Sequence, residues 1–155
     1  MYSRILVPID GSPTAQRGLE EAIALAGPLG AALHVLNVVD VRLLVNEVSA
    51  AVSPEQLLAD WRAAGDHLVT SAVKFARDRG LTVDGSVRCD PGMRVFELIL
   101  QEASDSAAEL IVMGTHGRRG LRRLALGSDA EMVLRESAVP VLLVRGPSED
   151  DGDRA

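Results

Sequence analysis

The chain has very few aromatic residues. Its 155 residues include one tryptophan, one tyrosine and two phenylalanines, although 47% of the residues are hydrophobic. A core of this length must therefore be built from alanine, valine and leucine, which suits helices packed closely on a parallel sheet. The length is that of a single domain, and it is sufficient to bury a core without disulfides or metals.

Cysteine is almost absent as well. Cys89 is the only one in the sequence, so an internal disulfide is excluded. A chain without disulfides fits a reducing compartment, and we expect a cytoplasmic protein. Cys89 lies in a predicted strand, where burial is a better interpretation than a reactive thiol.

The sequence also lacks a basic surplus and a long apolar run. The formal net charge is −6, which argues against binding to nucleic acid or to an anionic membrane surface. The N-terminus shows neither the basic region nor the apolar run of a signal peptide. The stretch 22–39 is apolar, but Gly27, Pro28, Gly30, His34 and Asn37 interrupt it. It therefore predicts a helix end, a turn and a buried strand, with no membrane insertion.

Strand and helix patterns alternate along the chain. Short apolar runs predict five strands, at 4–9, 32–39, 82–89, 110–113 and 141–144. The helices between them are expected from Ser12 and Pro13 to about Ala26, from Ser53 to near Gly80 along a stripe of apolar residues, over 95–103, and after Gly127. The stripe consists of Leu57, Trp61, Ala64, Leu68, Ala72 and Phe75.

This alternation predicts one α/β domain over residues 1–146, with a parallel sheet and helices on both of its faces. The strand at 82–89 is more polar than the others and is expected near an edge. The acidic residues 147–155 are predicted to be a disordered tail. The connection 40–52 has no clear period and is longer than usual. A cover over a site, a partner surface and a helical extension all remain open for it.

A glycine pattern points to the site. Gly114 follows the apolar run 110–113, Gly117 comes two residues further on, and nine residues separate it from Gly127 and Ser128 at a helix start. Glycines let a backbone approach a ligand closely, and a helix N-terminus attracts anions. The segment therefore predicts a phosphate-binding loop. It is neither a Walker A loop nor a dinucleotide fingerprint, because the residues that define those motifs are missing.

The expected crevice lies where the carboxyl ends of the parallel strands meet. Pro8, Ile9 and Asp10 end the first strand there, and Met113 ends the fourth. Asp10 is interpreted as a ligand for the nucleoside or for a metal ion, with helix capping beside Ser12 as the alternative.

Residues of the glycine loop have two interpretations each. The spacing of Ser128 and Glu131 matches a capping box, so Ser128 has a structural role that competes with phosphate binding. Asp129 in the first helical turn suits the helix dipole but repels phosphate, unless Mg²⁺ intervenes or the side chain points away. His116 is either a phosphate donor or a solvent-exposed side chain. The arginines of the loop are either solvated or folded over a polyphosphate; they are Arg118, Arg119, Arg122 and Arg123.

Catalytic machinery is not evident in the sequence. The three histidines, His34, His67 and His116, fall in a strand, a helix and a loop, without metal-ligand spacing. No fixed general base can be assigned, so binding is favoured over committed catalysis.

These segments together resemble the universal stress protein family, in particular its ATP-binding branch. The likeness spans roughly residues 2–146 and rests on the segments 7–12, 38–40, 113–117, 127–128 and 140–144. It implies a five-stranded parallel sheet of order 3-2-1-4-5 with helices on both faces. It also implies a homodimer, which the apolar edge strand 141–144 favours on physical grounds.

The resemblance implies ATP as the ligand, with Mg²⁺ carried on its phosphates or held partly by Asp10. The implied ATP-binding residues are Pro8, Ile9, Asp10, Val38, Met113, Gly114, His116, Gly117, Arg118, Gly127, Ser128 and Asp129. The expected role is a cytoplasmic stress-response regulator that switches conformation with its ligand and acts on an unidentified protein partner. A weak Mg²⁺-dependent ATPase and a dimeric interaction module with a vestigial pocket are the alternatives.

Overall fold

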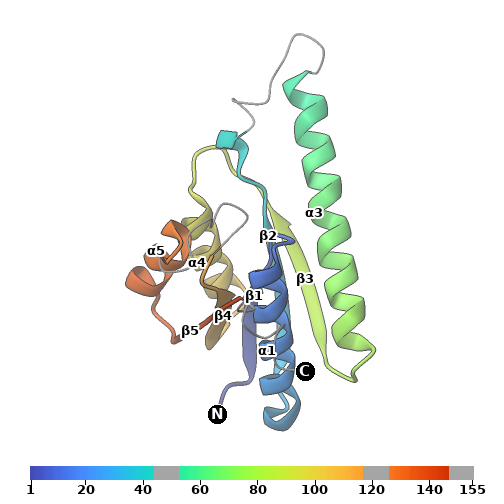
Figure 1. The fold of residues 1–155 in the computed structure, drawn as a ribbon, viewed down its shortest axis with the longest axis vertical. Helices are drawn as coiled ribbons and strands as arrows, with labels where there is room; N and C mark the ends of the chain where they lie inside the picture. Colours follow the sequence, from blue (N-terminus) through green and yellow to red (C-terminus); the bar gives the residue numbers. More distant parts are fainter. Residues whose placement is uncertain (44–52, 117–125, 147–155) are drawn as a thin grey trace, which may run out of the picture.

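A single parallel sheet organises the molecule (Figure 1). The computed structural model describes residues 1–43, 53–116 and 126–146. Its five strands lie in the order β3-β2-β1-β4-β5, which confirms the predicted order. Their bounds are Arg4–Pro8 for β1, Ala32–Val38 for β2, Val83–Arg88 for β3, Leu110–Gly114 for β4 and Val141–Val144 for β5.

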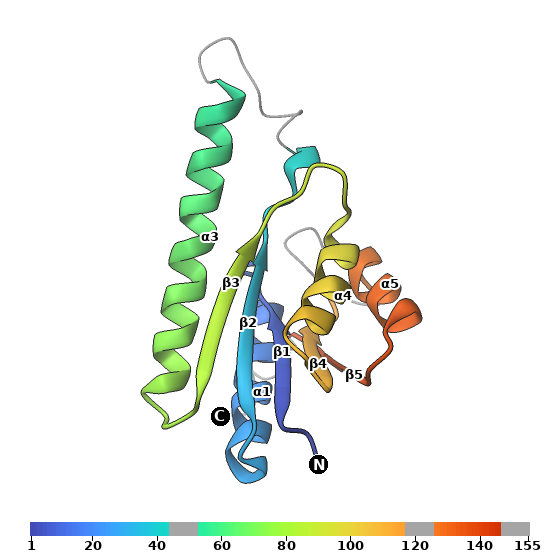
Figure 2. The same ribbon diagram turned by 180° about the vertical axis from the view of Figure 1, so that it is seen from behind.

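Helices cover both faces of the sheet, as predicted. Helices α1 and α3 lie on one face and α4 and α5 on the other (Figures 1 and 2). Their bounds are Pro13–Leu29 for α1, Pro54–Arg77 for α3, Val95–Asp105 for α4 and Ser128–Glu136 for α5. A short 3-10 helix, η1, spans Val41–Leu43 after β2.

Two aliphatic cores fill the spaces between these layers. Alternate residues of each strand point to opposite faces, so Val35 packs beneath α1 and α3, whereas Leu36 packs beneath α4 and α5. Both side chains are fully buried. The core contains small aliphatic residues in place of aromatic ones. Ala22 and Ala26 are examples, and their small side chains let α1 lie close to the sheet.

The helix starts follow the sequence, but one helix end does not. Ser12 and Ser53 cap α1 and α3, each accepting a hydrogen bond from a backbone amide of the first turn. The prediction that α1 ends near Ala26 is wrong. Pro28 is tolerated in the last turn, where its fixed φ is helical, and Gly30 ends the helix in the left-handed conformation with φ 64°.

The apolar stripe predicted for α3 is only partly right. Ala72 is buried, but Ala64 is exposed, and the other buried positions are Gly65, Val69 and Ala76. The long helix lies beside β3 and β2 and extends beyond the end of the sheet (Figure 1). The face that meets the sheet is therefore displaced toward small residues, since close contact with strands favours them.

Several expectations fall on segments that the structure does not describe. Most of the connection 40–52 and the predicted tail 147–155 lie outside the described residues, as do Gly117, Arg118 and the other loop arginines. Among the helices that are described, none is long and apolar enough to cross a membrane. The apolar stretch 22–39 is the end of α1, a turn and β2, as predicted.

Gly114 has a packing role that the phosphate-loop prediction did not include. A Cβ placed on Gly114 would lie 2.7 Å from Cγ2 of Thr14 and 2.9 Å from its backbone carbon and oxygen. The first turn of α1 thus rests directly on the end of β4. Absence of a side chain at Gly114 sets the distance between these two elements.

We expect Gly114→Ala to destabilise the fold by about 1–3 kcal/mol, because backbone atoms of α1 must move to admit the methyl group. Gly27→Ala is the matched control, since a Cβ at that exposed helical position meets nothing within 4 Å. The control should stabilise α1 by about 0.5–1 kcal/mol. Urea unfolding of both variants measures the difference, and equal midpoints would contradict this role for Gly114.

Candidate functional site

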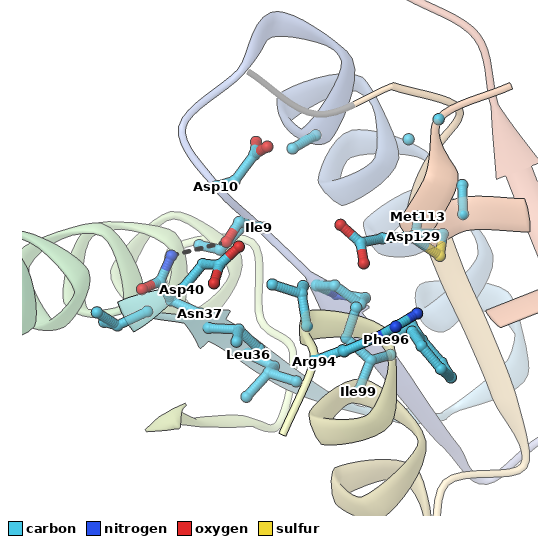
Figure 3. Close-up of a pocket in the computed structure, with 18 of the residues that line it drawn as sticks. Ile9, Asp10, Leu36, Asn37, Asp40, Arg94, Phe96, Ile99, Met113 and Asp129 are labelled. Atoms are coloured by element: carbon cyan, nitrogen blue, oxygen red, sulfur yellow. Dashed lines mark hydrogen bonds between the residues drawn. The ribbon is translucent and has the colours of Figure 1, made fainter. Parts of the chain in front are cut away.

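A large pocket opens at the carboxyl ends of β1, β2 and β4. Its volume is ≈ 900 Å³, and its wall is completed by η1, by the middle of α3 and by the first turns of α4 and α5 (Figure 3). The strand order reverses between β1 and β4, so the crevice is the one expected of an open parallel sheet. The lining is apolar at Val38, Phe96 and Ile99 and polar toward α5.

The turn after β1 forms one border of the pocket. The amide of Ser12 donates to Oδ1 of Asp10 at 2.9 Å, and Gly11 between them has φ 80°. A positive φ favours glycine, so this tight turn explains Gly11. The structural alternative for Asp10 is therefore real, because its carboxylate holds the turn that leads into the Ser12 cap. Asp10 still lines the pocket.

Asn37 anchors the pocket floor. Its side-chain amide donates to the carbonyl of Ile9 at 2.9 Å, and the residue is 6% exposed (Figure 3). A Cβ on Gly65 of α3 would lie only 2.4 Å from Oδ1 of Asn37, so the glycine makes room for this side chain. The contact joins the ends of β1 and β2 to α3 at one point.

The glycine segment begins and ends at a pair of backbone hydrogen bonds. Thr115 donates to the carbonyl of Val144 at 2.9 Å, and Gly127 donates to the carbonyl of Thr115 at 2.8 Å. The chain therefore returns to the end of β4 before α5 begins. Gly127 has φ −62°, a value open to any residue, and its amide serves this closure.

His116 is half-buried beside the pocket rather than solvent-exposed. Its Nδ1 lies 2.9 Å from Oγ1 of Thr115, which fixes the ring. Its Nε2 is buried and has no hydrogen-bond partner among the described residues. A buried ring nitrogen without a partner is costly, so a ligand atom at this position would relieve the cost.

The capping box predicted at Ser128 is wrong. Gly127 is the N-cap of α5, and no side chain within the described ranges caps that helix. Its first intrahelical bond runs from Glu131 to the carbonyl of Gly127 at 2.9 Å. Ser128 is the first helical residue, because the closing bond of the loop brings the chain into helix one residue later than a serine cap requires. The helix begins at the pocket, and the amides of a first turn have no intrahelical partners.

Three carboxylates and two arginines line the pocket within the described residues. Asp10, Asp40 and Asp129 carry the negative charges, and Arg42 and Arg94 carry the positive ones. The Asp129 carboxylate points toward the pocket interior (Figure 3). The chain segments described in the structure contain no group of three His, Cys, Asp or Glu residues placed to hold a metal ion.

Nearby carboxylates stabilise the charged form of Arg42. Its guanidinium donates to Asp40 through Nε at 3.1 Å, and this hydrogen bond raises the pKa of Arg42 above its usual value. The charges of Asp40 and Asp129 act in the same direction. Arg42 therefore stays charged at the rim of the pocket, between two carboxylates on different elements.

The structure brings together ten of the twelve residues that the sequence singled out. They are Pro8, Ile9, Asp10, Val38, Met113, Gly114, His116, Gly127, Ser128 and Asp129, and all of them line the pocket. Gly117 and Arg118 lie outside the described residues. The role of these residues in binding a nucleotide stays a prediction.

Other lining residues were missed from sequence. Asn37 had been interpreted only as a break in an apolar run, and Trp61 only as part of the core stripe of α3, yet both line the pocket. Arg94 directly precedes the helix predicted over 95–103, so its place at the same sheet edge was open to inference. Phe96 carried no signal of its own, since its pattern is that of an ordinary amphipathic helix.

Comparison with known proteins gives a consistent answer. The model of the universal stress protein family matches residues 1–145. The chain is 31% identical over 150 residues to universal stress protein MJ0531 of Methanocaldococcus jannaschii, covering 97% of this chain and 86% of that protein.

Solved structures share the fold. Protein MJ0577 of Methanocaldococcus jannaschii superposes with a TM-score of 0.81 at 28% identity, covering 96% of this chain and 99% of the other. A universal stress family protein from Burkholderia pseudomallei gives 0.75 at 32% identity, covering 92% and 95%.

Two more distant structures carry nucleotides. One is a universal stress protein in complex with cAMP, with a TM-score of 0.65 at 22% identity over 94% of this chain and 99% of that one. The other, from Archaeoglobus fulgidus in complex with dAMP, gives 0.64 at 21% identity over 92% and 98%. At these identities the likeness concerns the fold alone. On the family match and the closer relatives, this chain belongs to the universal stress protein family.

Proposed function

We propose that the pocket binds an adenine nucleotide, ATP, and that the protein acts as a ligand-controlled regulator rather than as a committed enzyme. One observation carries the proposal: the uncapped start of α5 faces a large pocket at the strand-order reversal. Unpaired amides and the positive end of the dipole form a site for anions. The cAMP and dAMP complexes of two proteins with this fold support a nucleotide as the ligand.

The pocket suits the two halves of such a ligand. In the proposed arrangement the adenosine lies against Pro8, Val38 and Met113, where the lining is largely apolar, and the phosphates lie at Ser128. His116 Nε2, which is buried without a partner among the described residues, is a suitable donor to the ligand. The volume of ≈ 900 Å³ falls within the range of small-molecule sites, roughly 300–1,000 Å³.

Mg²⁺ is expected to arrive with the phosphates. The described residues offer no ready-made metal cluster, and Asp129 faces the position proposed for the phosphates. A cation coordinated mainly by phosphate oxygens would offset the repulsion between them and this carboxylate. ATP should therefore bind more tightly with Mg²⁺ than without it.

Binding is proposed to act as a switch. A ligand that bridges α5 and the strand ends would fix α5 relative to β4 and alter the surface offered to a protein partner. The same binding would stabilise the folded state by mass action. A cytoplasmic site of action completes the proposal.

Asp129 favours one alternative, a dimeric interaction module whose pocket no longer takes ATP. A carboxylate aimed into the pocket is the specific observation behind it. Asp129→Asn separates the two functions, because a parent that binds no ATP and a variant that does would identify Asp129 as the cause. Asp66→Asn on the exposed face of α3 makes the same change in net charge away from the pocket.

Homodimerisation through β5 is the second part of the proposal. Strand β5 lies at the edge of the sheet. The carbonyls of Pro140 and Val144 accept from β4, so the amides of Val141 and Leu143 point to the outer edge. An apolar edge with unpaired amides favours pairing with the same strand of a second copy about a two-fold axis.

Ser128→Glu tests the nucleotide site. The substitution puts a carboxylate at the first position of α5, which suits the helix dipole and should preserve the fold, but it should repel phosphate. We expect the parent to bind Mg²⁺–ATP with micromolar affinity in calorimetry and the variant to lose at least tenfold in affinity. Thr70→Glu on the exposed face of α3 is the control for added charge. Equal affinities in all three proteins would remove the phosphates from α5.

Leu143→Pro tests the dimer. Proline removes the outward amide of an edge strand, a position where it is tolerated, so we expect a folded monomer. Leu143→Ala is the matched control, because it shortens the side chain but keeps the amide and should stay dimeric. Sedimentation velocity measures the mass of each protein. A dimeric proline variant, or a monomeric parent, would contradict pairing through β5.

A further inference from the structure

A cluster of ionisable side chains lies on the sheet face covered by α4. His34 and Glu102 are its buried members, whereas the side chain of Asp84 is 56% exposed. His34 of β2 is at its centre and is 7% exposed. Its Nε2 lies 2.7 Å from Oε1 of Glu102 on α4, and its Nδ1 contacts Oδ1 of Asp84 on β3. One imidazole therefore contacts a carboxylate with each ring nitrogen.

Both carboxylates favour the charged state. Burial alone would raise the pKa of Glu102, but hydrogen bonds from Ser86, Arg88 and His34 outweigh it and lower that pKa. Burial likewise opposes ionisation of Asp84, and hydrogen bonds from Arg4 and His34 reverse the effect and lower its pKa. Both carboxyl groups are therefore ionised at neutral pH and can only accept hydrogen bonds from the imidazole ring.

The number of hydrogen-bond donors that the ring must supply indicates its charge. A neutral imidazole has one N–H donor, whereas the imidazolium has two. Two ionised carboxylates on opposite sides of His34 can both accept a hydrogen bond only from the imidazolium. Loss of the proton from Nδ1 would leave its lone pair facing both Oδ1 of Asp84 and Nη2 of Arg4, so the hydrogen bond to Asp84 would be lost.

Other charged groups that face the cluster come from three elements. Arg4 of β1 donates to both oxygens of Asp84, at 2.9 and 2.8 Å, and its Nη2 lies 3.3 Å from Nδ1 of His34. Arg88 of β3 contacts Glu102 and also donates to Asp105 of α4 at 2.9 Å. The cluster is balanced when His34 is charged, because three cations then face the carboxylates of Asp84, Glu102 and Asp105.

The hydroxyl group of Ser86 contacts both buried members of the cluster, His34 and Glu102. Ser86 of β3 donates to Oε1 of Glu102 at 2.8 Å, and its oxygen lies 3.1 Å from Nε2 of His34. Ser86 therefore accepts a share of the Nε2 proton while it stabilises the charge of Glu102.

The cluster is connected to the pocket through two elements. On β2, Leu36 follows His34 on the same face and lines the pocket. On α4, Ile99 lies nearly one turn before Glu102 and lines the pocket together with Phe96. A contact that holds α4 on β2 and β3 therefore sets the position of one pocket wall.

We propose that His34 is a proton-dependent clamp, which as the imidazolium holds β3 and α4 together and in doing so keeps the α4 wall of the proposed nucleotide pocket in position. The part that concerns the ligand rests on the function proposed above. The part that concerns the fold does not, since the clamp joins β2, β3 and α4 whether or not a nucleotide is bound.

The imidazole and the carboxyl groups of the cluster make the stability of the fold depend on pH in opposite directions. The clamp requires the imidazolium, so its contribution to stability is lost wherever a rising pH removes a ring proton. The lowered pKa values of Asp84 and Glu102 act at the other end: their contribution is present above the unfolded-state values, near 4, and is lost as the pH falls through the lowered ones. The clamp is intact between these limits.

The first experiment is urea unfolding from about pH 5 to 8, the range in which imidazoles titrate. One proton bound only by the folded state changes the unfolding constant by up to about tenfold per pH unit. We expect wild type to lose stability with rising pH and His34→Gln, which offers one donor and one acceptor, to lack that component. His67→Gln on the exposed face of α3 is the matched control and should follow wild type.

A second measurement uses wild type alone, so it stands even where His34→Gln does not fold. Nitrogen-15 shifts of the His34 ring distinguish the imidazolium from either neutral tautomer. Two protonated ring nitrogens at neutral pH support the clamp. A neutral ring there, or equal pH slopes for wild type and His34→Gln, would overturn it.

Calorimetry with Mg²⁺–ATP across the same pH range tests the coupling. We expect affinity to fall by roughly fivefold or more as His34 loses its proton, a typical size for coupling between sites, and to be pH-independent in His34→Gln. An affinity that changes equally in both proteins overturns the coupling. Absence of binding at every pH refutes the proposed function instead, and the unfolding and nitrogen-15 results then decide the clamp on their own.

Discussion

Parallel pairing of β1 with both β2 and β4 is the constraint on which the rest of the structure depends. Ile5 pairs with Leu33 on one side and with Leu110 on the other, so the chain must leave β1 in one direction and return on the opposite side. Right-handed crossovers then place α1 and α3 on one face and α4 and α5 on the other. The crevice at the end of β1 follows from this reversal, because no crossover covers the gap between the departing chains.

The pocket contains groups that attract anions and groups that repel them. The start of α5 attracts anions through its amides and its dipole, while Asp129 in the same turn satisfies part of that field with its own carboxylate. Arg42 is held by Asp40 and feels the field of Asp129, so its charge is partly committed before a ligand arrives. A phosphate bound as proposed would therefore compete with carboxylates of the protein, and a cation on the phosphates would shift that competition in its favour.

Sequence patterns predicted the elements well because their signals are local. Apolar runs located all five strands, and Ser12 and Ser53 marked two helix starts that the structure confirms. The errors at Pro28 and Ser128 arose where a local rule met a wider constraint. Gly30 supplies the actual stop of α1, and the bond from Gly127 to Thr115 sets where α5 begins.

The candidate site was predictable where strand ends carry it and unpredictable where packing does. Asp10 and Met113 end strands that must converge, so topology alone brought them together. Asn37 and Gly65 form a contact between a strand and a distant helix, and each by itself has the pattern of an ordinary core residue. The double role of Gly114 was hidden for the same reason, since no spacing rule shows that Thr14 rests against it.

A polar residue on a buried strand face requires partners from every neighbouring layer, and this requirement links the core to the pocket. His34 interrupts the otherwise apolar face of β2, and the helix above and the strand beside it each supply a carboxylate. Removing one partner from such a group leaves a buried charge uncompensated, which costs more than the pair contributes. The cluster therefore acts as a unit, and α4 can leave the sheet only if several ion pairs open together. The same helix forms a wall of the pocket, so the position of that wall depends on charges that do not line the pocket themselves.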